Sequence, residues 1–191
     1  MIKPIRNSYG YRNLLVYKKA EELQLELSKF VSHFPHSKTL LALSDQMERS
    51  ARSTKQNIIE GWKRNSTNEY YQFLGYAVAS NAELEADFTD ICIGIYESKG
   101  IGKGKKWGEW EEEKIESIPF YPLDPLLPLP LQLKLRAKEI NFLLDKLQNS
   151  LLEKMKTEKT LASADRFRIR EREDAERRKE LGEYLLKRGW D

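Results

Sequence analysis

Few residues in this sequence have the types and spacing that chemistry at a protein site requires. The two histidines, His33 and His36, are three positions apart, but Pro35 between them disfavours a continuous helix, and no cysteine or carboxylate cluster completes a metal site. Residues 100–105 loosely resemble a phosphate-binding loop, yet they lack the Walker spacing and follow no predicted strand. We therefore predict no enzyme: no catalytic residue, no metal site, no cofactor and no small-molecule substrate.

Cys92 is the single cysteine and lies among isoleucines, which favours a packed thiol over a nucleophile. One cysteine excludes an internal disulfide and agrees with a reducing compartment. The N-terminal residues lack the apolar core of a signal peptide, and no stretch approaches the length of a membrane span. We expect a cytoplasmic protein with no membrane partner.

Cationic side chains are better placed to bind a partner. Arg49, Arg52 and Lys63 fall on one stripe of a predicted helix, opposite its apolar face, and Lys55 and Arg64 flank that stripe. Arginine and lysine at regular spacing on a rigid helix suit phosphates. Asp45 and Glu60 lie on the same stripe and could pair with some of these cations. The alternative is an ordinary solvated surface.

The elements that position these residues follow from apolar spacing. Apolar residues recur every three or four positions over 16–34, 40–62, 70–95 and 133–151, which predicts four amphipathic helices and no sheet. Asn13 is a possible N-cap of the first helix, and Ser66 with Glu69 forms a capping box before the third. Short connections and narrow apolar seams predict an all-α, antiparallel up-down four-helix bundle.

Asn81 interrupts the third apolar seam, either as an amide bonded to a neighbouring helix or as a residue that fixes register in an assembly. The bundle should occupy residues 11–156. It is interrupted before the fourth helix by a Gly-, Lys-, Trp- and Pro-rich insertion at 99–130, whose proline-rich end should be extended and should pack on the bundle or on a partner. A charged helical tail at 157–191 should be a solvated helix, a basic arm on nucleic acid or a docking helix.

Charge is unevenly distributed along the chain. Residues 1–65 carry 12 Lys and Arg against 6 Asp and Glu, whereas residues 66–98 carry 6 acidic residues and no basic one. Distinct basic and acidic faces suit the binding of a polyanion or charge-matched self-association.

Three segments resemble a known family. Residues 11–20 (YRNLLVYKKA), 57–64 (NIIEGWKR) and 69–85, with its Glu83-Leu84-Glu85, are similar to the small four-helix-bundle proteins encoded in intervening sequences of bacterial 23S ribosomal RNA genes. The resemblance covers roughly residues 11–98. The insertion and the tail depart from the short members of the family, and Lys63 stands where a small residue is usual.

The superfamily includes the accessory variability determinant (Avd) of diversity-generating retroelements, a homopentamer that binds reverse transcriptase and template RNA. The resemblance thus implies a bacterial, RNA-binding accessory protein that forms a homo-oligomer, a pentamer, and has these two partners. It points to Arg49, Arg52, Lys55, Lys63 and Arg64 as the RNA-contact residues, here called the basic row. The alternatives are a 23S rRNA intervening-sequence protein with no polymerase partner and a purely structural self-assembling module.

Overall fold

The structure is a computed structural model that describes residues 9–64, 66–101 and 112–160, together with positions 172, 175 and 179. Within this part of the chain every regular element is a helix. In chain order they are η1 (Gly10–Asn13), α1 (Leu15–Val31), α2 (Lys38–Lys63), α3 (Thr67–Cys92), η2 (Glu97–Lys99), α4 (Glu112–Ser117) and α5 (Leu129–Thr160).

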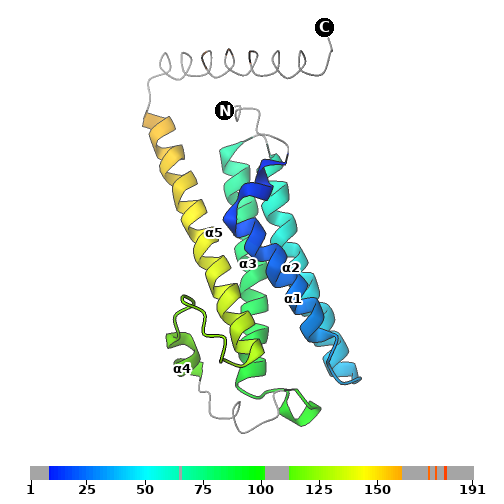
Figure 1. Cartoon of the computed structure of the whole chain (residues 1–191). Coiled ribbons are helices and arrows are strands. Elements are labelled where there is room, and N and C mark those ends of the chain that lie inside the picture. The colour runs from blue at the N-terminus through cyan, green and yellow to red at the C-terminus, as the bar shows by residue number, and fades with distance from the viewer. Residues whose placement is uncertain are drawn as a thin grey trace.

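The long helices α1, α2, α3 and α5 run alternately up and down (Figure 1). The main contacts follow a ring, in which α2 packs on α1 and α3, and α5 packs on α3 and α1. The predicted four-helix bundle is therefore confirmed. The division into a bundle at 11–156 and a tail at 157–191 stays a prediction, because most of the tail lies outside the described residues.

Apolar residues at the predicted spacing close the bundle interior. Side chains with no exposed surface come from all four long helices: Leu27, Leu40, Met47, Ile58, Leu74, Leu84, Phe88, Leu133, Ile140 and Leu144. Burying a side chain of this size contributes about 1.5–3 kcal/mol, so the seams are the main source of stability. No helix in the described part of the chain has the length and apolar character needed to cross a bilayer.

The predicted helix ends are partly right. Ser66 caps α3, since its hydroxyl oxygen accepts the Glu69 backbone N–H at 3.1 Å and donates to the Glu69 carboxylate at 2.7 Å. Asn13 is not the N-cap of α1, because it ends the 3-10 turn η1 and the extended residue Leu14 takes the cap position. The third helix ends at Cys92, so Ile95 lies beyond it and is 56% exposed.

Asn81 is fully buried in the α3 seam, and its side-chain amide donates to the Ala137 carbonyl of α5 at 2.7 Å. This confirms the expectation of an amide bonded to a neighbouring helix. A buried amide left without a partner would cost about 1–3 kcal/mol, so this bond favours one register between α3 and α5.

The insertion packs on the bundle. Ile115 of α4 is fully buried with Cys92, Leu131 and Leu135, and apolar residues of the following segment cover this second cluster: Ile118, Phe120, Leu123 and Leu127. The segment between α4 and α5 contains no helix, as its prolines predict. The glycine-rich beginning of the insertion, from residue 102 to residue 111, lies outside the described residues.

Candidate nucleic-acid interface

The basic row lies along the solvent-facing side of α2. Arg49, Arg52, Lys63 and Arg64 are exposed and Lys55 is half-buried. With a rise of about 1.5 Å per residue, the row from Arg49 to Lys63 extends for about 21 Å. α2 holds it straight, because the opposite face of the helix is buried through Leu40, Met47 and Ile58. The structure places Arg49, Arg52, Lys55 and Lys63 on α2, and Arg64 is the extended residue directly after it. The contact of these residues with RNA stays a prediction.

Two cations of the row already have carboxylate partners one helical turn away. Arg49 pairs with Asp45, and Arg64 lies 3.7 Å from Glu60. Both pairs are exposed, and such pairs contribute about 0–1 kcal/mol. A phosphate can therefore replace either carboxylate at small cost. Among the described residues, Arg52, Lys55 and Lys63 have no hydrogen-bond or ion-pair partner.

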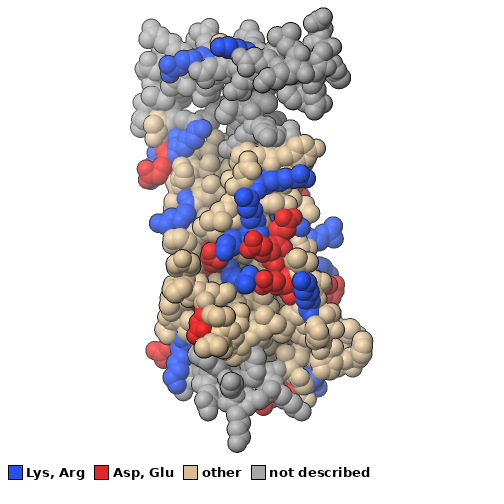
Figure 2. Space-filling model, viewed as in Figure 1, with Lys and Arg blue, Asp and Glu red and all other residues tan. Residues whose placement is uncertain are grey.

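A groove of about 600 Å³ lies between α1 and α2 beside the row. Its charged lining is balanced: Glu21, Asp45, Glu48, Arg49, Arg52 and Lys55. Glu48 accepts a hydrogen bond from the Ser28 hydroxyl at 3.2 Å. The face of the molecule that carries α1 and α5 likewise mixes positive and negative side chains (Figure 2). Binding of a polyanion would thus depend on individually placed cations and not on one large positive field.

The contact between α2 and α3 contains an acidic group that sequence reasoning missed. Asp87 is 8% exposed and accepts hydrogen bonds from the Gln46 side chain at 3.3 and 3.4 Å. Burial, and then the nearby carboxylates of Asp90 and Glu83, raise the pKa of Asp87 to about 6. The available sequence signal for the burial of Asp87 was its position immediately before Phe88, which is buried.

A buried cation joins the insertion to the bundle, and sequence reasoning missed it as well. Lys134 of α5 has no exposed surface, and its ammonium lies 3.3 Å from Glu85 of α3 and 2.6 Å from Glu116 of α4. Asn141 donates to the second oxygen of Glu85 at 2.7 Å. The signal in the sequence is the run Leu131–Leu135, in which leucines alternate with Gln132 and Lys134. Leucines at these positions point to several sides of a helix, which predicts a helix start that is covered on several faces.

The other candidate chemical groups are held in structural contacts. The Nδ1 atom of His33 lies 2.7 Å from the Lys29 carbonyl, and no group of three or more His, Cys, Asp or Glu among the described residues could hold a metal ion. Cys92 is buried, and this burial raises the pKa of its thiol to about 12. A thiol in that state is protonated at neutral pH and is a poor nucleophile, as predicted for a packed cysteine.

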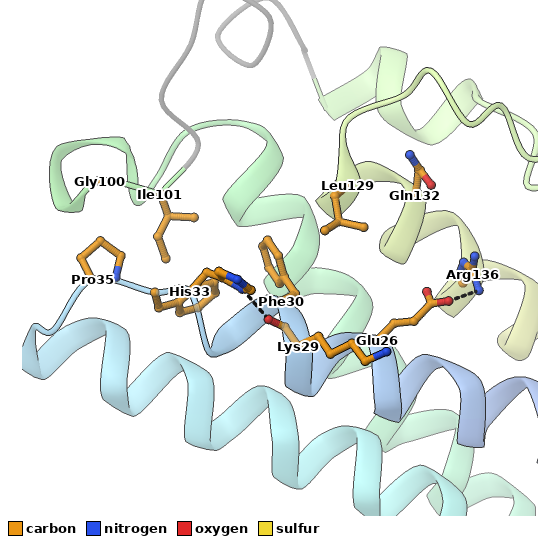
Figure 3. A pocket seen from close by; sticks show the side chains of 11 residues that line it. Glu26, Lys29, Phe30, His33, Pro35, Gly100, Ile101, Leu129, Gln132 and Arg136 are labelled. Carbon is orange, nitrogen blue, oxygen red and sulfur yellow. Dashed lines mark hydrogen bonds and ion pairs between the residues drawn. The ribbon is translucent and has the colours of Figure 1, made fainter.

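A larger pocket, of about 660 Å³, lies where the end of α1 meets the start of α5 (Figure 3). Its walls are mainly apolar, with Phe30, Phe34, Ile101 and Leu129. Arg136 on its edge pairs with Glu26 at 2.9 Å. Lys29 also lines the pocket, but its walls are mainly apolar, so the pocket is less suited to phosphate than the basic row.

Comparison with known proteins supports the resemblance for the first three bundle helices. Residues 12–93, from the third residue of the 3-10 turn η1 to the residue after α3, match the family model described as 23S rRNA-intervening sequence protein. No match was found among curated proteins or solved structures. The matched segment contains the whole basic row.

Proposed function

We propose that the chain, whose residues 12–93 match the family model described as 23S rRNA-intervening sequence protein, is a non-enzymatic, RNA-associated helical scaffold. The observation that carries the proposal is the basic row on α2, in which Arg52, Lys55 and Lys63 have no carboxylate partner among the described residues. Cations held on a rigid helix lose little conformational freedom when they bind phosphates. The bundle would bind the phosphate backbone of the RNA without altering the RNA chemically.

The family match favours the ribosomal-RNA role over the role in a retroelement. A reverse-transcriptase partner, an Avd-like activity and a pentameric assembly remain predictions from the wider superfamily. A reverse-transcriptase gene beside this one, with a near-repeat pair, would favour the retroelement role. A position inside a ribosomal RNA operon would favour the other.

The test is RNA binding by a charge-neutralised variant of α2. Arg52→Gln combined with Lys55→Gln removes two unpartnered cations, and the pairs of Arg49 and Arg64 stay in place. We expect the affinity for a fluorescein-labelled RNA stem-loop to fall by about tenfold or more at fixed salt. The slope of log affinity against log salt should become less steep by about 2, because two fewer phosphates are neutralised. Fluorescence anisotropy over a salt series measures both quantities.

The matched control is Lys146→Gln combined with Lys156→Gln, which removes the same charge from exposed positions of α5. This variant should bind the stem-loop nearly as the native chain does. If both double variants lose affinity equally, net charge and not the basic row governs binding. An unchanged affinity in the α2 variant would remove this face as the RNA site.

A further inference from the structure

Aromatic and basic side chains meet on the surface where α2 ends and α3 begins. Lys63 and Arg64 come from the end of the basic row, and Phe73 and Tyr76 come from the second and third turns of α3. The Arg64 guanidinium carbon lies 4.3 Å from the centre of the Phe73 ring. The Phe73 and Tyr76 ring centres are 5.6 Å apart, at an interplanar angle of 86°. We call these four residues the aromatic–basic corner.

The backbone under the corner is held by close packing. Gly61 allows this approach, because a Cβ atom there would lie 2.8 Å from the Tyr70 ring and 2.9 Å from the Phe73 Cβ. The Ser66 cap fixes the first turn of α3, as described above. The corner therefore exists before any ligand arrives, which lowers the entropy cost of binding.

Tyr76 offers a flat surface to solvent. Its side chain is 58% exposed, and its nearly perpendicular contact with Phe73 leaves at least one face of the Tyr76 ring uncovered by Phe73. Nucleic-acid bases stack on such faces when they are unpaired, whereas the bases of an intact duplex are already stacked on each other.

The two cations at the end of the basic row suit the backbone of the same nucleotides, since Arg64 contacts Phe73, which contacts Tyr76. Lys63 is exposed. Arg64 lies over the Phe73 ring, and both side chains of its ion pair with Glu60, at 3.7 Å, are exposed. A guanidinium over a ring still has several N–H groups to donate, and phosphate oxygens can accept them.

We propose that the aromatic–basic corner binds unpaired nucleotides, with a base stacked on Tyr76 and the adjoining phosphates bound by Lys63 and Arg64. This inference rests on the proposed RNA-binding function and adds a preference to it. The rest of the basic row would contact the phosphate backbone of paired and unpaired RNA alike, and the corner would favour RNA that has an unpaired stretch.

The test compares two RNA probes of equal length, a 12-nucleotide oligouridylate and a blunt 12-base-pair duplex, by fluorescence anisotropy. Tyr76→Ala should weaken binding of the oligouridylate by about 5- to 100-fold, which corresponds to the loss of one stacked base. Duplex affinity should stay within about twofold, and Tyr76→Phe should bind both probes like the native chain, because the ring is what stacks.

Phe142→Ala is the matched control. Phe142 is 46% exposed and has the Lys146 ammonium 5.3 Å from its ring centre. It lies on α5 and so outside the surface that α2 and α3 form. This variant should leave both affinities unchanged, and circular dichroism melting checks that each variant is folded.

The outcomes separate this inference from the proposed function. Equal losses on both probes, or no loss on either, in Tyr76→Ala would overturn the role of the corner. The Arg52 and Lys55 variant would still decide the role of the row in either case. A native chain that binds neither probe nor the stem-loop would overturn both.

Discussion

Single buried polar residues affect how the stability of this bundle depends on pH. Asn81 and Asp87 both lie on α3 with 0% and 8% exposure, yet they behave differently. Asn81 is neutral, and its side-chain N–H donates to the Ala137 carbonyl at every pH. Asp87 must either lose a proton in a poorly hydrated site or keep it, so its contribution to stability depends on pH.

We expect Asp87→Asn to stabilise the protein above pH 7 and to change little at pH 4. The folded-state pKa of Asp87, about 6, exceeds its ordinary value of 3.8. The folded form therefore holds the proton more tightly, and the stability that this provides is complete below about pH 4 and is lost as pH rises through 6. Asparagine removes the cost of the buried charge, which a shift of this size places at about 3 kcal/mol.

Urea denaturation at pH 4 and pH 8 measures this difference. Asparagine keeps an oxygen that can accept from Gln46, so the hydrogen bonding at the site is retained. An equal change in the free energy of unfolding at both pH values would show that ionisation of Asp87 does not affect stability.

The residues predicted from sequence and the residues missed differ in a physical way. Asn81 could be predicted because it sits at a position of an apolar seam, where helical periodicity implies burial, and Cys92 because isoleucines surround it in the sequence. Lys134 was missed, although its apolar neighbours indicate a covered helix start, because its burial depends on α4 and on Glu85, which are far away in sequence. The pairing of Arg49 with Asp45 is local, and the sequence indicated it as one possibility.

At the scale of elements, the crossing of α2 and α3 depends on the absence of a side chain at Gly61. Glycine inside a helix is usually about 1 kcal/mol less stable than alanine. Here a Cβ atom would collide with Tyr70 and Phe73, so Gly61→Ala should lower the free energy of unfolding by about 1–3 kcal/mol.

Gly75 of α3 provides the comparison for this substitution. A Cβ atom there would meet only the end of the Gln148 side chain, at 3.5 Å, which is an ordinary contact. Gly75→Ala should therefore raise the free energy of unfolding by up to about 1 kcal/mol. Thermal and urea unfolding of the two variants should move in opposite directions, and a stabilising Gly61→Ala would show that α2 and α3 can separate without cost.

Helix ends were predictable where one side chain decides them and not where the backbone does. Ser66 caps α3 through its own hydroxyl. The start of α1 is instead set by η1, whose last backbone bond runs from the Leu14 N–H to the Tyr11 carbonyl at 3.0 Å. A 3-10 turn of this kind has no distinctive side-chain pattern, so Asn13 was a reasonable but wrong cap.

For the molecule as a whole, the insertion is joined to the bundle through Lys134. We expect Lys134→Ala to lower the free energy of unfolding by about 3 kcal/mol, because it leaves Glu85, whose side chain is 18% exposed, without its cation. Glu116→Gln should cost less than about 1 kcal/mol, since Glu116 is 50% exposed and can be hydrated. Urea denaturation compares the two, and equal costs would contradict the asymmetry in burial.

Adding Glu85→Gln to Lys134→Ala should recover part of that loss, because the second change removes the uncompensated charge. The same denaturation curves provide the measurement. A double variant less stable than Lys134→Ala would show that Glu85 stabilises α5 by a route other than its pair with Lys134.

Charge distribution over the whole chain was readable from the sequence, but its consequence in space was not. The basic excess of residues 1–65 and the acidic character of residues 66–98 lie on neighbouring helices of one bundle, in which α2 packs against α3. Acidic and basic groups therefore alternate across neighbouring surfaces. Binding by this molecule should be more sensitive to which cation is replaced than to its net charge of +3.

The sealed thiol of Cys92 has a practical consequence. It is the single cysteine of the chain, and it is covered on one side by the bundle and on the other by α4 and the segment that follows. An aromatic disulfide reagent can react with this thiol only while the cover is displaced. The rate of colour release at neutral pH therefore measures how often the insertion opens. An added RNA that lowers this rate would have to bind more tightly to the closed molecule than to the open one.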